Sequence, residues 1–181
     1  MLILASASPR RHELLLAAGI PHIVRPAHIP EHRLPGEGAL DFVRRIAERK
    51  ARRASREAAD IVLGADTIIC FENEMLGKPE SEPDARRMLR LLSGRDHWVH
   101  TGICVLSRDR CIIDVSSTKV SFADLTDDEI EEYTRSAEPY DKAGAYAIQG
   151  RASKFVRFIE GCYHNVVGLP VSLVYGHLKG L

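Results

Sequence analysis

Two consecutive arginines near the start of the chain occupy a position where cations are unusual. Arg10 and Arg11 follow Ser8 and Pro9, a pair typical of a helix that begins with a hydroxyl N-cap and a proline at its first position. The N-terminus of a helix already carries partial positive charge, so each misplaced cation costs up to about 1 kcal/mol. The small residues 5–8 expose backbone N–H groups, and with two guanidinium groups they make a good site for phosphate. Arginines that simply extend into water are the alternative, but the pair beside this loop favours phosphate.

Asp66 is a carboxylate inside an apolar run. Residues 61–71, IVLGADTIICF, predict a core strand with apolar residues on both sides of the aspartate. A carboxylate there is out of place unless it binds a metal, pairs with a cation or takes part in catalysis. The alternative is a turn or bulge over residues 64–67 that Asp66 caps. Because the strand resumes at once through Ile68 and Ile69, we favour a functional carboxylate.

Lys50 falls on the buried stripe of a predicted helix over residues 39–58. The apolar positions of this helix follow the three-and-four spacing of a buried face: Val43, Ile46, Ala47, Ala51 and Ala54. An ammonium group on that face must either extend to water or find an anion, because unpaired burial is expensive. Five arginines lie on or near the outer face, where we expect them to be solvated: Arg44, Arg45, Arg49, Arg52 and Arg53.

Three further polar residues lie in predicted loops. Glu31 stands in a stretch rich in proline and glycine, and Lys78 stands between Gly77 and Pro79; a solvated side chain is the simpler interpretation of each. Gln149 and Gly150 close the segment DKAGAYAIQG, whose small residues permit close approach of the backbone to a ligand. An amide can donate to and accept from one edge of a nucleobase, whereas a tight turn is the alternative for this segment.

The elements that must position these residues alternate along the chain. Helices are predicted over residues 9–18, from Ser81 to Gly94, from a capping-box pattern at Thr126 to Glu129, and over 171–178. Strands are predicted at 2–4, 22–24, in a hairpin returning through 75–76, in two runs within 97–122 joined by 107–110, and in FVRFIEG over 155–161. Residues 163–170 are predicted to form a loop.

Composition narrows the class of protein. At 181 residues the chain is long enough for one domain, or for two small lobes sharing one core. Lysine plus arginine and aspartate plus glutamate both total 25, so the net charge gives no support for a general polyanion-binding role. The four cysteines lack CxxC spacing, which indicates reduced thiols and no zinc site. No run reaches about 18 apolar residues, so we expect a soluble, cytoplasmic protein that contacts no membrane.

The chain resembles the Maf family of nucleoside triphosphate pyrophosphatases over essentially its whole length. The ordered motifs that carry the resemblance are LASASPRR, ERKA, LGADTII, LGKP, LSG, DKAGAYAIQG and YHNVVGLP. Within the family, DKAGAYAIQG is similar to the branch that acts on dTTP and UTP, whereas the branch that cleaves 7-methyl-GTP has a different sequence there.

The resemblance implies an α/β fold in which helices flank a central mixed, twisted sheet and two lobes enclose a cleft, all within one Maf-like domain over residues 1–181. It implies hydrolysis of a nucleoside triphosphate to the monophosphate and pyrophosphate, with Mg²⁺ or Mn²⁺ as cofactor. By position, the catalytic acid is Asp66, which with Glu31 would hold the metal, although Pro30 stands where relatives often carry a second acid. The other expected substrate-binding residues are Ser8, Arg11, Glu31, Lys50 and Lys78, and the expected base-selecting residues are Arg10, Thr67 and Gln149.

Several alternatives stay open on sequence alone. The same chemistry on another base, such as 7-methyl-GTP or CTP, is the nearest, and the DKAGAYAIQG segment argues against 7-methyl-GTP. A non-catalytic nucleotide-binding regulator of cell division would need no acid at Asp66. A nucleic-acid-binding protein is disfavoured by the zero net charge and by the lack of an aromatic platform. A homodimer is neither predicted nor excluded. Whether Asp66 acts as general base or as metal ligand also stays open.

Overall fold

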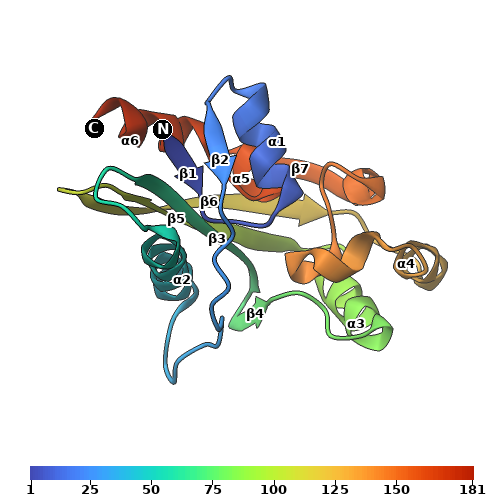
Figure 1. Cartoon of the computed structure of the whole chain (residues 1–181). Helices are drawn as coiled ribbons and strands as arrows, with labels where there is room; N and C mark the ends of the chain where they lie inside the picture. Colours follow the sequence, from blue (N-terminus) through green and yellow to red (C-terminus); the bar gives the residue numbers. More distant parts are fainter. The chain divides into compact units, whose positions relative to one another are not determined.

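The computed structural model describes all residues from 1 to 181 and contains seven strands and six α-helices (Figure 1). The elements in chain order are β1 (Leu2–Leu4), α1 (Pro9–Ala17), β2 (His22–Val24), α2 (Ala39–Ala54), β3 (Ile61–Phe71), β4 (Glu74–Leu76), α3 (Glu82–Leu92), β5 (Asp96–Leu106), β6 (Cys111–Phe122), α4 (Asp127–Thr134), β7 (Val156–Glu160), α5 (Tyr163–Val167) and α6 (Val171–Lys179). Three short 3₁₀ helices lie between α4 and β7: Glu138–Asp141, Ala143–Ala145 and Arg151–Phe155. None of the helices is both long enough and apolar enough to cross a membrane.

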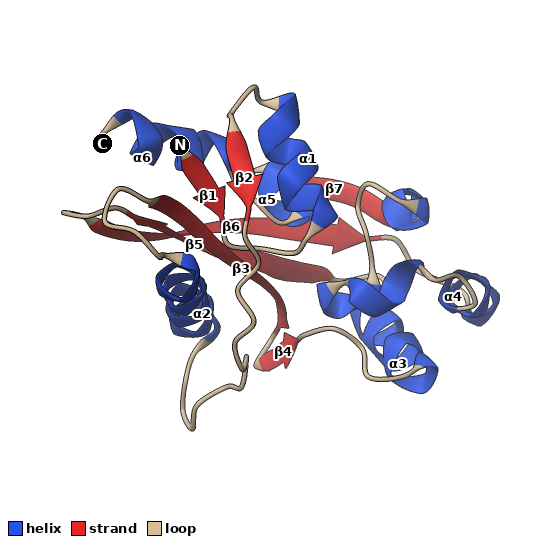
Figure 2. Ribbon diagram, viewed as in Figure 1, coloured by secondary structure: helices blue, strands red, loops and turns tan.

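The strands form one sheet in the order β2-β1-β3-β5-β6-β7, with β4 paired to β3 (Figure 2). β1 pairs with β2 and with β3 in parallel, whereas β3 with β4 and β6 with β7 pair antiparallel. The expected α/β fold with a mixed sheet is therefore confirmed. The expected cleft between two lobes stays a prediction.

The chain divides into two compact units. Unit 1 comprises Met1–Thr67, His100–Ser116 and Gly168–Leu181, and unit 2 comprises Ile68–Val99 and Ser117–Val167. A single domain over residues 1–181 stays a prediction.

In unit 1, helix α2 packs closely on one side of the strands, and α1 lies on the other side (Figure 1). Glycine allows this approach, because a Cβ at Gly64 of β3 or at Gly102 of β5 would overlap the backbone of α2. The buried stripe of α2 is the predicted one, and it includes Lys50. The core between helix and strands is formed by small and β-branched residues: Ile3, Ala5, Ala47, Ala51, Ala54, Val62 and Cys104.

In unit 2, aromatic side chains fill the core. The ring of Phe122 on β6 meets Tyr146 edge to face, and the ring of Tyr133 on α4 meets Phe155 in the same way. The buried imidazole of His97 on β5 packs against Phe122, and its Nε2 forms a hydrogen bond of 2.8 Å with the hydroxyl of Tyr146. These contacts fix the middle of the DKAGAYAIQG segment.

Two predicted element boundaries are wrong. α2 ends at Ala54 rather than at residue 58, because the carboxylate of Asp60 accepts the backbone N–H groups of Arg56 and Glu57 and closes a turn there. Residues 163–170, predicted as a loop, contain the short helix α5. Its buried Asn165 donates to the carbonyl of Val99 and to the hydroxyl of Thr118, which are contacts distant in sequence.

Candidate active site

An ion triplet of two buried side chains and one exposed side chain joins three of the predicted residues of unit 1. The Nζ of Lys50 on α2 lies 2.8 Å from Oδ1 of Asp66 on β3 and 2.8 Å from Oε1 of Glu31, which is in the loop after β2. The side chains of Lys50 and Asp66 are only 10% and 8% exposed, whereas that of Glu31 is 47% exposed. Lys50 therefore finds an anion rather than extending to water. Glu31, for which a solvated side chain was the simpler interpretation, is exposed and also pairs with Lys50.

Asp66 is the electrostatically unusual member of this triplet. Burial raises the pKa of Asp66 above its usual range, and the charges of Lys50 and Arg11 oppose that rise. A carboxylate with raised proton affinity in a buried site is suited to accept a proton from a reacting water. The oxygen that does not face Lys50 is the one available for this step.

The loop that carries Glu31 is attached to α2 by arginines. Arg45 forms a two-pronged ion pair with Glu37, at 2.5 and 2.6 Å, and donates to the carbonyl of His32 at 2.9 Å. This pairing lowers the pKa of Glu37 to about 2. Arg49 donates to the carbonyl of Pro30 at 3.3 Å. The prediction of a solvated arginine run is therefore wrong for Arg45, whose side chain is partly buried, whereas Arg49 is exposed as predicted; both donate to the carbonyls of the two residues that flank Glu31.

Arg11 is buried, and most of its donors are used within the protein. Its Nε donates to the carbonyl of Gly168, one terminal nitrogen donates to Ser6 Oγ and to the carbonyl of Ala65, and the other donates to Thr67 Oγ1. These bonds use four of the five guanidinium N–H groups. Burial lowers the pKa of Arg11, and the charge of Asp66 opposes this change. Arg11 thus has one N–H group left for a ligand, fewer than a bidentate phosphate clamp needs.

Thr67 belongs to the arginine network. Its hydroxyl accepts from Arg11 at 3.0 Å and also lies 2.9 Å from Thr101 Oγ1 and 3.4 Å from the carbonyl of Gly168. Successive residues of a strand point to opposite faces, so Asp66 faces α2 while Thr67 faces α1. The carboxylate and the guanidinium group therefore occupy opposite faces of one strand.

The start of α1 matches the prediction in position but not in its capping bond. Ser8 is the N-cap residue and Pro9 the first helical residue, yet the Ser8 hydroxyl makes no cap hydrogen bond. The backbone N–H of Ser8 donates instead to Ser6 Oγ at 3.2 Å. The N-terminus of α1, which includes the half-exposed Arg10, therefore has no cap from the Ser8 side chain, and a helix N-terminus is suited to an anion.

Lys78 and Gln149 belong to unit 2. Both side chains are exposed, Lys78 in the connection from β4 to α3 and Gln149 at the end of the small-residue segment. The backbone N–H of Gly144 donates to the carbonyl of Gly77 at 2.9 Å, so the segment of Gln149 is attached to the residue before Lys78.

Two residues of the arginine network were not among the predicted site residues. Ser6 bonds Arg11 and also accepts from Ser8, and Gly168 supplies a carbonyl to Arg11 from a backbone conformation with φ of +128° that favours glycine. Both residues lie within motifs of the family resemblance, LASASPRR and YHNVVGLP. These motifs are the sequence signal that could have identified them.

The carboxylates fit a divalent cation that is shared with a substrate. One oxygen of Asp66 and one of Glu31 each lie 2.8 Å from the ammonium of Lys50, so a divalent cation bound between these two oxygens would have to displace the ammonium. Mg²⁺ prefers such oxygen ligands and is usually bound by one or two carboxylates together with substrate phosphates. The structure contains no cluster of three or more His, Cys, Asp or Glu side chains that could form an all-protein cage.

Comparison with known proteins gives a consistent result. The family model described as "Maf-like protein" matches residues 1–181. Proteins named "dTTP/UTP pyrophosphatase" from Geobacter sp. (strain M21) and Koribacter versatilis (strain Ellin345) are 51% and 49% identical, over 98% of this chain and 94% and 93% of their own lengths. One of the same name from Bacillus cereus (strain AH820) is 45% identical over 98% of this chain and 94% of its own. The chain therefore belongs to the Maf-like protein family.

Proposed function

We propose that this chain hydrolyses dTTP and UTP to the nucleoside monophosphate and pyrophosphate. The observation that carries the proposal is the Asp66–Lys50–Glu31 ion triplet, in the same unit as the N-terminus of α1, which the Ser8 side chain does not cap. Ser8, Glu31 and Asp66 all lie beyond the carboxyl ends of the paired segments of the parallel strands β1, β2 and β3. Ligands of open α/β sheets bind at these ends. The close similarity to proteins named for this activity supports the same substrates.

The triphosphate would be held by backbone and cationic groups. The first-turn N–H groups of α1 and the Ser8 hydroxyl offer hydrogen-bond donors, and Arg10 adds charge beside them. Lys78 is proposed as a further phosphate ligand. Arg11 contributes its positive charge and a single N–H group, because its other donors fix the backbone of β3 and the segment at Gly168.

Asp66 is the proposed catalytic acid–base residue. In the proposed step a water attacks the α-phosphorus, its proton passes to the carboxylate of Asp66, and the bond to the pyrophosphate leaving group breaks in line with the attack. Lys50 lowers the pKa of Asp66 against the larger effect of burial and holds the carboxylate in place before the step. Asp66 and Glu31 would hold Mg²⁺ or Mn²⁺, which when bound neutralises negative charge on the phosphates.

Base selection is assigned to Gln149, Thr67 and Arg10. The exposed amide of Gln149 can both donate to and accept from the edge of a pyrimidine. The Thr67 hydroxyl is already bonded to Arg11, so we propose that it acts on selection by orienting that guanidinium group. Arg10 stays a candidate for both base and phosphate contact.

Pyrophosphate release measured with Mg²⁺ over dTTP, UTP, CTP, GTP and 7-methyl-GTP tests the function. We expect the highest kcat/KM for dTTP and UTP. Preference for 7-methyl-GTP would place the chain in the other branch, and absence of turnover with all five would leave a nucleotide-binding regulator as the better account.

The substitution Asp66→Asn tests whether Asp66 is the catalytic acid–base residue. Turnover is expected to fall by a factor of at least about 10³ while the fold is retained, because the amide keeps the shape of the carboxylate but cannot accept the proton. Asp114→Asn is the matched control, since Asp114 is half-exposed and its contacts, with His177 and with the backbone N–H of Val115, lie in the same unit. Near-normal turnover in Asp66→Asn would remove Asp66 from the mechanism.

A further inference from the structure

Gln149 differs from its neighbours because its side chain is exposed while residues 144–148 are buried. A hydrogen bond from Gly150 N to the carbonyl of Ala147 closes a turn that presents it at the surface. Base selection by an amide requires its donor and acceptor to be held in one place. The contacts that hold this turn in place are therefore expected to affect selectivity among nucleobases.

Glu138 fixes the backbone after Gln149. Its carboxylate accepts hydrogen bonds from the N–H groups of Arg151 at 3.0 Å and Ala152 at 3.4 Å. These are the first residues of the 3₁₀ helix Arg151–Phe155, and N–H groups at a helix start have no partner within the helix. The carboxylate supplies that partner and anchors the chain two residues beyond Gln149.

Tyr133 fixes the backbone before Gln149. Its hydroxyl donates to Oε1 of Glu138 at 2.8 Å and accepts from the N–H of Ala147 at 3.3 Å. Tyr133 is 2% exposed and packs edge to face on Phe155, so its oxygen has little freedom to move. The two anchors thus bracket Gln149, one on each side.

The surroundings of the Glu138 side chain suit a carboxylate. A Cβ at Gly150 would overlap the carboxylate of Glu138, so the absence of a side chain at Gly150 lets the acid lie against the turn. Both oxygens of Glu138 accept from N–H or O–H donors. A glutamine of the same shape would turn an NH₂ group toward one of those donors and lose that bond.

We propose that Glu138 is a positioning residue for base selection: together with Tyr133 it holds the turn that presents Gln149 to the nucleobase. The proposal rests on the proposed function, because it assigns Glu138 a role in the selectivity of that same activity. It predicts that loosening the anchor reduces selectivity more than it reduces the maximal rate.

The test compares Glu138→Gln with Glu132→Gln. Glu132 is the matched control because it is an exposed acid on α4 that pairs with the Arg151 side chain at 2.9 Å and leaves the backbone anchor intact. In Glu138→Gln we expect the dTTP to CTP ratio of kcat/KM to fall about tenfold, through a higher KM for dTTP with little change in kcat. Glu132→Gln should keep the wild-type ratio. Tyr133→Phe, which deletes one hydroxyl, should shift the ratio in the same direction.

Hydrogen exchange gives a readout that does not depend on activity. The amides of Arg151 and Ala152 should exchange at least about tenfold faster in Glu138→Gln than in the wild type or in Glu132→Gln. Unchanged exchange would refute the anchor. Faster exchange with an unchanged substrate ratio would refute the role in selection. A wild-type protein that turns over no nucleotide would refute the proposed function, and the role in selection with it, whatever the exchange shows.

Discussion

Replacing Lys50 by methionine should destabilise the protein in a pH-dependent way. Methionine matches much of the length of the lysine side chain but removes the ammonium that lies 2.8 Å from both Asp66 and Glu31. Glu31 is 47% exposed and can be solvated, whereas Asp66 is 8% exposed and cannot. The effect of the substitution is therefore expected to come from Asp66.

The size of the effect follows from burial of that carboxylate. At 2.8 Å the attraction between Lys50 and Asp66 is about 6 kcal/mol for an effective dielectric constant of about 20, and much of it offsets desolvation. Removal of one partner of a buried pair costs about 3–5 kcal/mol when the remaining charge is unpaired. Asp66 can reduce this cost by binding a proton.

The sign of the pH dependence comes from the pKa of Asp66. Burial already raises this pKa, and the loss of Lys50 raises it further because the ammonium opposes the rise. An acid with a raised pKa in the folded state favours folding at low pH and loses that contribution as pH rises through the folded-state pKa. The penalty of Lys50→Met should therefore be small at pH 5 and large at pH 8. Since one pKa unit is about 1.4 kcal/mol, the change between these values is at most about 4 kcal/mol.

Urea unfolding of the wild type, Lys50→Met and Lys50→Met/Asp66→Asn at pH 5 and pH 8 measures this change. The double variant has no buried charge at this position and should recover most of the stability at pH 8. Lys119→Met is the control, because Lys119 pairs with Glu160 at an exposed position and its effect should hardly depend on pH. A penalty that is equal at both pH values, or a double variant as unstable as Lys50→Met, would contradict the reasoning.

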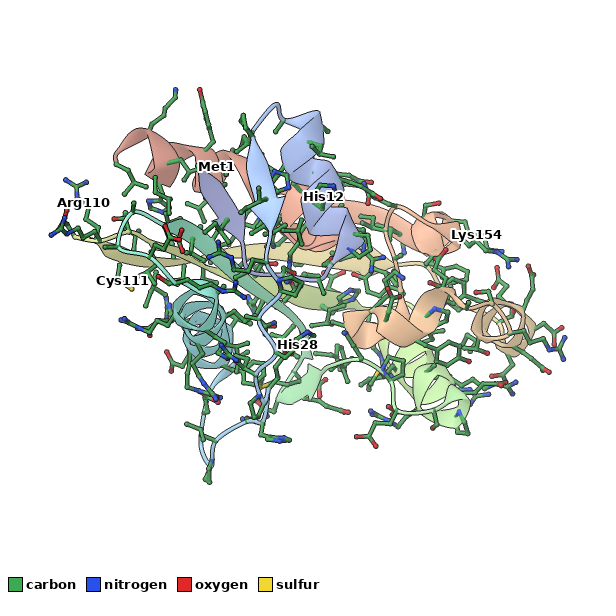
Figure 3. The ribbon with its side chains drawn as sticks, in the orientation of Figure 1. Met1, His12, His28, Arg110, Cys111 and Lys154 are labelled. Carbon is green, nitrogen blue, oxygen red and sulfur yellow. The ribbon has the colours of Figure 1, made fainter.

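Three further predictions concern unit 1. Arg11→Lys should lower the free energy of unfolding by about 2–4 kcal/mol in urea titrations, because one ammonium cannot satisfy the acceptors of the guanidinium group; unchanged stability would contradict this network. Gly64→Ala should lower the melting temperature because the new Cβ overlaps the backbone of α2, whereas Gly176→Ala, in open space on α6, should not lower it. Maleimide should label the exposed Cys111 near the tip of the β5–β6 hairpin (Figure 3) well before the buried Cys104, whose pKa is raised by burial; mass spectrometry after proteolysis distinguishes the two.

Elements with local signals could be predicted from the sequence. Ser81 accepts from the N–H of Asp84 at the start of α3, and Thr126 and Glu129 form the expected capping box at α4. The four-residue connection 107–110 joins β5 to β6 as its turn pattern predicted. In contrast, α5 has only five residues and is held by the distant partners of Asn165, so nothing within its own sequence distinguished it from a loop.

The residues of the candidate site, like the helices and strands, could be predicted from the sequence only in part. Asp66 and Lys50 could be identified separately because each is a charge at a position that should be apolar. That they pair with each other depends on how α2 lies on β3, which no local pattern encodes. The burial of the Arg11 side chain could not be predicted either, because two of its hydrogen-bond acceptors are main-chain carbonyls 54 and 157 residues away in the sequence.

Asp66 and Thr67 are adjacent on β3. This adjacency links Arg11 to Asp66 even though four of the five guanidinium N–H groups of Arg11 are already used within the protein. Asp66 faces Lys50 and Thr67 accepts from Arg11, so one peptide unit separates the two charge clusters. Arg11 makes no contact with the carboxylate, yet its charge lowers the pKa of Asp66 against the effect of burial. A buried guanidinium group held by four hydrogen bonds cannot move toward or away from Asp66, so this influence is constant. The charge of Arg11 therefore acts on the proton affinity of Asp66 from a fixed position, without contact between the two side chains.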